Sequence, residues 1–300
     1  MKILLALDGS PSSLVARDLV RDAGWPDGTE VHLLTAYDAP MDWLPAGFEL
    51  AAGWPGWEAA EEGTRSEIDQ ELARHEAQLA ERGLRVTRHV VRGRAAQVIV
   101  AQAGRLEADL VVTGSRGHGK LETMLLGSVA DEVTARSPCP VLVARSASVS
   151  RLLVATDGSE DAHGIPDVLA ALPFAAGKPV EVLAISVPDP PGFDLIATLY
   201  TLGSVRPDLL AREATEYAQA SGQRMVEHLG RAGITANAHV RRGDPAREIV
   251  AAAQELGADL IVLGSRGLGG VERLLLGSVA RGVLTAAHCS VLVVRPPAGG

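Results

Sequence analysis

Two copies of a glycine- and serine-rich motif are the residues of this chain best suited to bind an anion. The first copy, "GSRGHGKLETMLLGSVA", spans 114–130, and the second, "GSRGLGGVERLLLGSVA", spans 264–280, with twelve of seventeen positions identical. Each copy has the spacing Gly-x2-Gly-x9-Gly-Ser. Glycines at fixed distances indicate a backbone that approaches another group closely or adopts a positive φ.

The chemistry expected of this motif is phosphate binding. Gly114–Gly117 would form a tight loop whose N–H groups point at an anion. Gly127 and Ser128 would then open a helix, where the N–H groups and the helix dipole favour a phosphate. The alternative is that the glycines only mark turns, since a duplication would preserve such glycines as well.

The two copies differ in the positive charge that they carry. In the first copy Arg116, His118 and Lys120 would assist anion binding, whereas the second copy keeps Arg266 and has Leu268 and Gly270 at the other two positions. Neither copy is a P-loop, because no Gly-Lys-Ser/Thr ends it, and no G-x-G-x-x-G follows either first strand.

The duplication extends beyond the motif. "KILLALDGSPSS" at 2–13 matches "RLLVATDGSEDA" at 151–162, and "VHLLTAYD" matches "VEVLAISV". Asp8 lies 106 residues before Gly114, and Asp157 lies 107 residues before Gly264. These matches predict two domains of one kind, residues 1–147 and residues 148–300.

Apolar runs alternate with segments of helical periodicity in each half, which predicts an α/β fold with a mostly parallel five-stranded sheet and helices on both faces. Ligands of such sheets bind beyond the carboxyl ends of the strands. The strands expected in the first half are 2–7, 30–37, 84–91, 109–114 and 140–145, and the helices are 11–23, 60–82, 94–105 and 127–136. Ser10 followed by Pro11 is typical of a helix N-cap, not of a catalytic nucleophile.

Composition excludes several classes of function. The chain has 300 residues, a net charge of −9 and no long cluster of basic residues, so no nucleic-acid groove is expected. No apolar stretch is long enough to span a bilayer, and Asp8 interrupts the N-terminal apolar run, which favours a cytoplasmic protein. Cys139 and Cys289 are expected to be small buried residues rather than a disulfide, and the scattered histidines predict no metal site made only of protein ligands.

With these residues in view, the chain resembles a tandem member of the universal stress protein family. The Asp-Gly-Ser after each first strand, the spaced glycine motif and the closing "PVLV" strand match that family across both halves. The glycine motif is the pattern of the family's ATP-binding branch. The resemblance implies two Rossmann-like domains of the adenine nucleotide alpha hydrolase-like type.

The resemblance also implies which residues bind the ligand. Backbone at Ala36 and Val187 would hold adenine, Asp8 and Asp157 would lie under the adenosine, and the glycine motifs would hold the phosphates. The expected residues of the first half are Ala6, Asp8, Ala36, Thr113, Gly114, Ser115, Arg116, Gly117, His118, Gly119, Lys120, Gly127, Ser128 and Val129. Those of the second half are Ala155, Asp157, Val187, Leu263, Gly264, Ser265, Arg266, Gly267, Gly269, Gly277, Ser278 and Val279.

The function implied is that of an ATP-binding regulator of a stress response or growth state, with an unknown protein partner, and not that of an enzyme. Mg²⁺ or Mn²⁺ would accompany the triphosphate. The alternatives are a slow ATPase or nucleotidyl-transfer enzyme and an interaction scaffold with vestigial pockets.

Three further expectations concern particular segments. Family members pair through their final strands, so 140–145 and 290–295 are expected to pair as an internal pseudo-dimer, with a homodimer of whole chains also possible. The tryptophan-rich segment 38–62 would be a flap over its own domain, a lid on the nucleotide or a contact surface. Asp244-Pro245 is a good start for a helix, whereas the equivalent Arg94-Ala95 is a weaker one.

Overall fold

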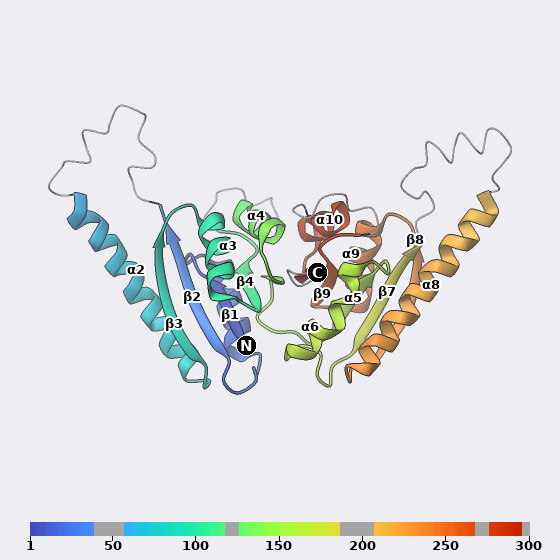
Figure 1. The fold of residues 1–300 in the computed structure, drawn as a ribbon, viewed down its shortest axis with the longest axis horizontal. Coiled ribbons are helices and arrows are strands. Elements are labelled where there is room, and N and C mark those ends of the chain that lie inside the picture. Colours follow the sequence, from blue (N-terminus) through green and yellow to red (C-terminus); the bar gives the residue numbers. More distant parts are fainter. Residues whose placement is uncertain (39–56, 118–125, 187–206, 268–275, 296–300) are drawn as a thin grey trace, which may run out of the picture. The chain divides into compact units, whose positions relative to one another are not determined.

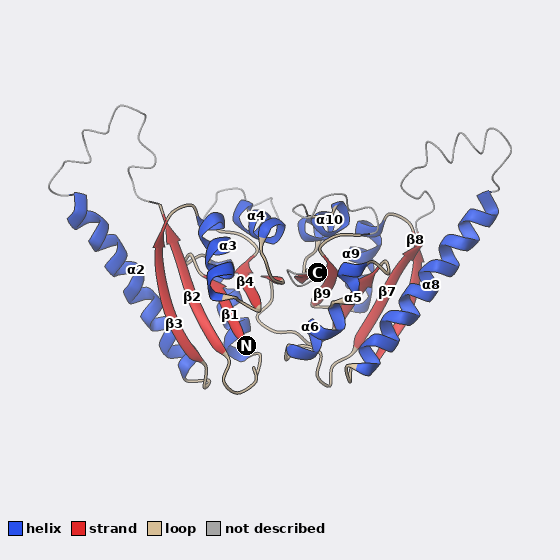
Figure 2. Ribbon diagram, viewed as in Figure 1, coloured by secondary structure: helices blue, strands red, loops and turns tan. Residues whose placement is uncertain are grey.

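The chain forms two compact α/β units, Met1–Ala147 and Ser148–Gly300. The computed structural model describes residues 1–38, 57–117, 126–186, 207–267 and 276–295 (Figure 1). Each unit consists of one sheet and the helices that cover it (Figure 2).

The sheet of the first unit has five parallel strands in the order β3-β2-β1-β4-β5. Continuous apolar sequences such as Leu110–Gly114 are buried along their whole length, as expected of strands covered on both faces. The strands are β1 (Lys2–Ala6), β2 (Glu30–Tyr37), β3 (Arg85–Arg92), β4 (Leu110–Gly114) and β5 (Val141–Ala144).

Among the described residues, four helices cover this sheet: α1 (Pro11–Asp22), α2 (Trp57–Ala80), α3 (Ala95–Leu106) and α4 (Ser128–Arg136). Helices α1 and α2 pack against each other and on one face, while α3 and α4 pack together on the other. The N-cap of α1 is Ser10, whose side chain accepts a hydrogen bond from Ser13 N–H, as its position before Pro11 predicts.

The second unit repeats the same strand order, β8-β7-β6-β9-β10, again with parallel pairs. Its strands are β6 (Leu152–Thr156), β7 (Val180–Ser186), β8 (Ala236–Arg242), β9 (Leu260–Gly264) and β10 (Ser290–Val294). Its helices are α5 (Glu160–His163), α6 (Ile165–Ala171), α8 (Pro207–Arg231), α9 (Pro245–Leu256) and α10 (Ser278–Ala286).

One difference between the units lies in the helix after the first strand. The counterpart of α1 is divided into α5 and α6 at Gly164, which ends the first helix and precedes the second. Pro166 lacks the N–H that a continuous helix would need and its ring would clash with the carbonyl four residues earlier, so the helix breaks there.

The structure confirms the predicted fold class, and the elements predicted for the first half agree with those observed to within three residues at each end. The predicted helix caps are confirmed as well, because Asp244 accepts a hydrogen bond from Arg247 N–H whereas Arg94 makes no side-chain cap. Pairing of the two final strands stays a prediction.

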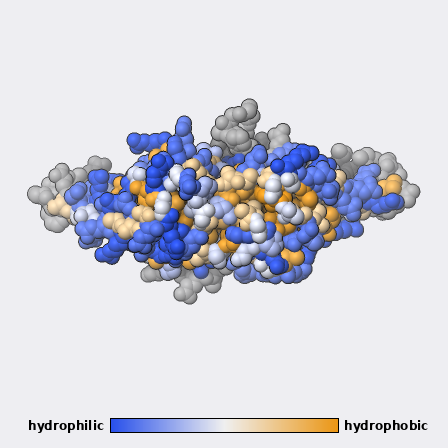
Figure 3. All heavy atoms as spheres, turned by 90° about the horizontal axis from the view of Figure 1, so that it is seen from below, coloured by the Kyte–Doolittle hydropathy of each residue, from blue (hydrophilic) through white to orange (hydrophobic). Residues whose placement is uncertain are grey.

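The face drawn in Figure 3 shows hydrophilic residues with apolar patches between them. Cys139 is buried just before β5, and Cys289, just before β10, is partly buried. Within the described part of the chain, no helix combines the length and apolar character needed to cross a membrane.

Candidate functional site

The loop after β1 begins the candidate site. Asp8 Oδ1 accepts a hydrogen bond from Ser10 N–H at 3.0 Å, and Gly9 between them has φ +76°. The Ser10 hydroxyl donates to the carbonyl oxygen of Arg116 at 3.2 Å. This contact joins the loop after β1 to the loop after β4, although the two residues are 106 positions apart.

The glycine motif of the first unit closes into a loop on the same edge of the sheet. The N–H of Gly127 donates to the carbonyl oxygen of Ser115 at 2.7 Å, so the two ends of the motif lie together across the segment that separates them. A Cβ placed on Gly117 would lie 2.6 Å from Asp8 Oδ2. The motif therefore lies directly against the carboxylate that follows β1.

Close approach, not positive φ, explains the glycines of this motif. A Cβ on Gly114 would lie 2.6–2.7 Å from backbone atoms of Ser12 and Ser13, and one on Gly127 would lie 3.2 Å from Arg116 Cα. Positive φ values occur instead at Gly9 and at its counterpart Gly158. Of the two reasons for glycine that the sequence left open, the structure selects the first for the motif.

Helix α4 starts within this loop and offers hydrogen-bond donors. Gly127 is its N-cap and has no side chain to accept from the first-turn N–H groups. Ser128 and Val129, the first two residues of the helix, are exposed to solvent. Uncapped N–H groups at an exposed helix start can donate hydrogen bonds to an anion.

A cavity of about 290 Å³ adjoins this loop in the first unit. It is formed by the ends of β1 and β2 together with one side of α2. The lining residues are Leu7, Asp8, Gly9, Thr35, Ala36, Ile68, Glu71, Leu72 and His75. The predicted residues Asp8 and Ala36 thus line one cavity, while Ala6 and Thr113 are buried in the adjoining strands.

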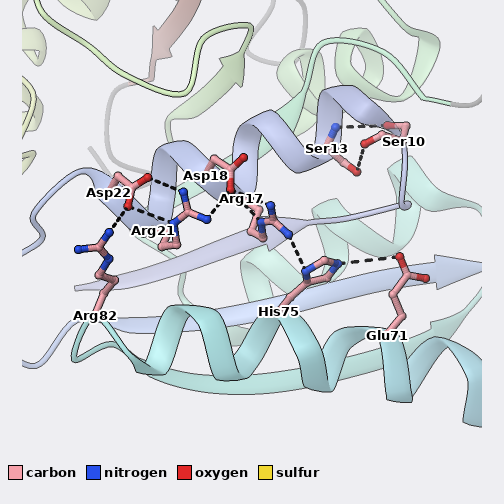
Figure 4. Close-up of polar contacts among 9 residues, drawn as sticks. All are labelled: Ser10, Ser13, Arg17, Asp18, Arg21, Asp22, Glu71, His75 and Arg82. Carbon is pink, nitrogen blue, oxygen red and sulfur yellow. Dashed lines mark hydrogen bonds and ion pairs between the residues drawn. The ribbon is translucent and has the colours of Figure 1, made fainter.

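Polar contacts between α1 and α2 hold the cavity wall in place (Figure 4). Arg17 lies 3.0 Å from His75 Nδ1, and because a guanidinium only donates, Nδ1 must be the acceptor. The neutral ring then carries its proton on Nε2, which lies 3.9 Å from Glu71. Burial, and next the charge of Arg17, lower the pKa of His75, so the ring is held neutral.

The second unit builds the same backbone loop. Gly277 N–H donates to Ser265 O at 2.8 Å, and a Cβ on Gly267 would lie 2.6 Å from Asp157 Oδ2. The N-cap of α10 is Gly277, again without a side-chain cap. The predicted residues Ser278 and Val279 stand at the start of this helix, and Ala155 and Leu263 are buried in strands β6 and β9.

The side chains around the second loop differ from those around the first. Asp161 is buried, with 4% of its surface exposed, and accepts hydrogen bonds from the Ser265 hydroxyl and the Arg266 guanidinium. Beside Gly158, the Ser221 Oγ and the Tyr217 hydroxyl lie 2.8 and 3.1 Å from the position that a Cβ would take. Helix α8 therefore approaches this loop closely.

One predicted equivalence between the units is wrong. In the sheet of the first unit Ala6 pairs with Leu34, and in the second unit its counterpart Ala155 pairs with Leu183. Leu34 and Leu183 are therefore equivalent. Two residues later along each strand, the counterpart of Ala36 is Ile185 and not Val187. Val187 itself lies outside the described residues, as do the predicted His118, Gly119, Lys120 and Gly269 and most of segment 38–62.

The side chains that α1, α2 and their counterparts contribute beside the loops were not among the predicted site residues. Asp161 could have been found by aligning it with Ser12, since both stand four residues after the aspartate that follows the first strand. His75 and Glu71 had no comparable signal, because their position beside the cavity depends on how α2 packs on the sheet.

Comparison with known proteins places both units in one family. The model of the universal stress protein family matches residues 1–145 and again residues 149–295. A universal stress protein of Mycobacterium tuberculosis is 32% identical over 204 residues, a match that covers 63% of this chain and 62% of the relative. The match thus spans less than two thirds of that relative's length.

One solved structure agrees in fold along nearly the whole chain. A universal stress protein from Archaeoglobus fulgidus matches with a TM-score of 0.66 at 21% identity, covering 98% of both chains. Another from the same organism, solved in complex with dAMP, covers 48% of this chain and 97% of its own, at 24% identity and a TM-score of 0.35. Because the family model matches nearly the whole chain in two successive copies, this protein belongs to the universal stress protein family.

Proposed function

We propose that this protein binds ATP at the carboxyl edge of its sheets and acts as a nucleotide-dependent regulator of a stress response or growth state. The observation that carries the proposal is the loop in which Gly127 N–H meets Ser115 O at 2.7 Å. This contact sets an uncapped helix start beside a tight glycine turn, so that backbone N–H groups from two segments serve one phosphate chain.

The rest of the nucleotide fits the neighbouring cavity of the first unit. Its volume of about 290 Å³ is close to the lower limit for small-molecule sites, and it opens between the ends of β1 and β2. The base and ribose would enter this cavity, and Asp8, which both lines it and lies against Gly117, would stand between ribose and phosphates.

A divalent cation would accompany the triphosphate. ATP brings several negative charges to a protein with a net charge of −9, and Asp8 adds another at the site. Mg²⁺ or Mn²⁺ bound mainly by phosphate oxygens and water would offset this charge.

Mass spectrometry of nucleotide released from freshly purified protein, followed by a turnover assay, tests the proposal. Bound ATP without turnover would support a regulator that reports nucleotide occupancy to a partner protein. Sustained release of ADP or AMP would instead support a slow enzyme, and protein that binds no nucleotide at any concentration would support a scaffold.

A pair of matched variants tests the location of the site. In Gly127→Val the new side chain would crowd Arg116 Cα, which a Cβ alone would approach to 3.2 Å, and would occupy the space that phosphates need. Calorimetry should show ATP binding lost from the first unit only. Gly277→Val is the matched control, since it places the same side chain in the second loop, and unchanged stoichiometry in both variants would contradict the site.

A further inference from the structure

Among the described residues, Asp161 distinguishes the surroundings of the two glycine loops. Ser12 takes its place in the first unit, four residues after Asp8, as Asp161 stands four residues after Asp157. Both positions contact the first glycine of the motif. A Cβ on Gly114 would lie 2.6 Å from the Ser12 carbonyl carbon, and one on Gly264 would lie 3.0 Å from Asp161 Cβ.

The carboxylate of Asp161 binds the polar side chains of its loop. Oδ2 accepts the Ser265 hydroxyl at 2.6 Å and Arg266 Nε at 3.1 Å, while Oδ1 accepts the other Arg266 nitrogen at 2.9 Å. This two-point geometry is the strong form of an arginine–carboxylate pair. Because the side chain of Asp161 is almost wholly buried, solvent screens this pair little.

The pairing of Asp161 with Arg266 reduces the positive charge that the second loop offers to a phosphate. A phosphate at the second loop meets an arginine that a carboxylate already neutralises. At the first loop the residue in the same place is Ser12, which has no charge. The second motif also has Leu268 and Gly270 where the first has His118 and Lys120, so its sequence supplies less positive charge.

We infer that Asp161 weakens triphosphate binding in the second unit, so that the two sites of one chain differ in affinity for ATP by at least tenfold. The inference rests on the proposed ATP-binding function and assigns a role that acts on the phosphates alone. Asp161 is a specificity-determining residue here: it does not exclude the nucleoside, but it neutralises the arginine of the loop that would bind the phosphates.

Exchange of the two residues tests the inference in the full chain. With the first site removed by Gly127→Val, calorimetry with Mg²⁺–ATP measures the second site before and after Asp161→Ser. We expect the exchange to tighten ATP binding at least tenfold. With the second site removed by Gly277→Val, the reciprocal Ser12→Asp should weaken ATP binding at the first site by a similar factor.

Adenosine affinity distinguishes an effect on the phosphates from a general change in the structure of the loop. Because Asp161 acts on the phosphates, adenosine affinity should not change in either exchange. Asp161→Asn keeps the shape of the side chain without its charge, so it should also tighten ATP binding. It serves as the test if the serine variant fails to fold. Equal changes for adenosine and ATP, or no gain for ATP in either Asp161 variant, would overturn the inference.

The outcomes also separate this inference from the function on which it rests. A chain that binds no ATP at either site would refute the proposed function. A chain that binds ATP with equal affinity in both units would leave that function standing and refute the role of Asp161.

Discussion

Gly114→Ala should destabilise the first unit without acting through any ligand. The new Cβ would lie 2.6 Å from the carbonyl carbon of Ser12 and 2.7 Å from Ser12 O and Ser13 N. These are backbone atoms in the first turn of α1, so no side-chain rotation can relieve the contact. Strand β4 and helix α1 would have to separate by close to 1 Å to restore ordinary contact distances.

The expected cost follows from the balance of two effects. Overpacking of this kind costs about 3 kcal/mol. Replacing glycine by alanine also restricts the unfolded chain and stabilises the folded state by up to about 1 kcal/mol, since φ at Gly114 is not positive. The net loss should therefore be about 2 kcal/mol, which corresponds to about 1 M in urea midpoint at a typical slope of about 2 kcal/mol per M.

Gly264→Ala is the matched variant in the second unit. There the nearest atom to the new Cβ is Asp161 Cβ at 3.0 Å, and backbone atoms lie no closer than 3.2 Å. A shift of a few tenths of an ångström relieves these contacts, so the overpacking cost of about 1 kcal/mol and the gain from the restricted unfolded chain nearly cancel.

Tryptophan fluorescence during urea unfolding measures the two variants separately. All four tryptophans lie in the first half, so their signal reports the first unit. Gly114→Ala should lower the midpoint of this transition by about 1 M, and Gly264→Ala should leave it unchanged. A midpoint for Gly114→Ala within about 0.3 M of the unsubstituted protein, at equal slope, would refute the packing argument.

Two more predictions concern pH and metal. Burial lowers the pKa values of His75, His32 and His89 from the ordinary value of 6.5. The folded state therefore favours the neutral rings. The stability that these residues contribute is present above pH 6.5 and is lost as the pH falls through their folded-state pKa values. His75→Gln should reduce the fall in the tryptophan-detected midpoint between pH 7.5 and 5.5, and an unchanged fall would contradict this account. Excess chelator should weaken ATP binding several-fold relative to Mg²⁺ at equal ionic strength, because the triphosphate then meets Asp8 and the net charge of −9 without a cation; equal affinity in the two conditions would count against a bound metal.

Strands and most helices could be predicted from the sequence because local patterns determine them. Continuous apolar runs such as Leu110–Gly114 suit strands covered on both faces, and Ser10 before Pro11 begins a helix on its own chemistry. The break between α5 and α6 was not predicted, although Pro166 provides a local signal for it. The prediction used the residues that the two halves share, and the break lies at Gly164 and Pro166, where their sequences differ.

Contacts between side chains on different elements could not be predicted in the same way. The hydrogen bond between Arg17 and His75 joins residues 58 positions apart, and it exists because α1 and α2 pack side by side. Nothing in the spacing of either residue indicates that contact. The same holds for Asp161 and Arg266, whose pairing depends on the approach of β9 to the start of α5.

The comparison of the two units explains why backbone and side chains behave differently after duplication. Loop closure needs glycine wherever a Cβ would crowd another backbone atom. A Cβ on Gly127 would lie 3.2 Å from Arg116 Cα, and one on the equivalent Gly277 would lie 3.2 Å from Ser265 O. Side chains beside the loop meet no such requirement, and at these positions the halves diverge: Leu72, which lines the cavity of the first unit, corresponds to Gly222. A Cβ on Gly222 would lie 3.5 Å from Ala184 Cβ, so α8 lies close to its sheet there. The shared loop thus provides the same N–H donors twice, and the residues around it determine what each copy can bind.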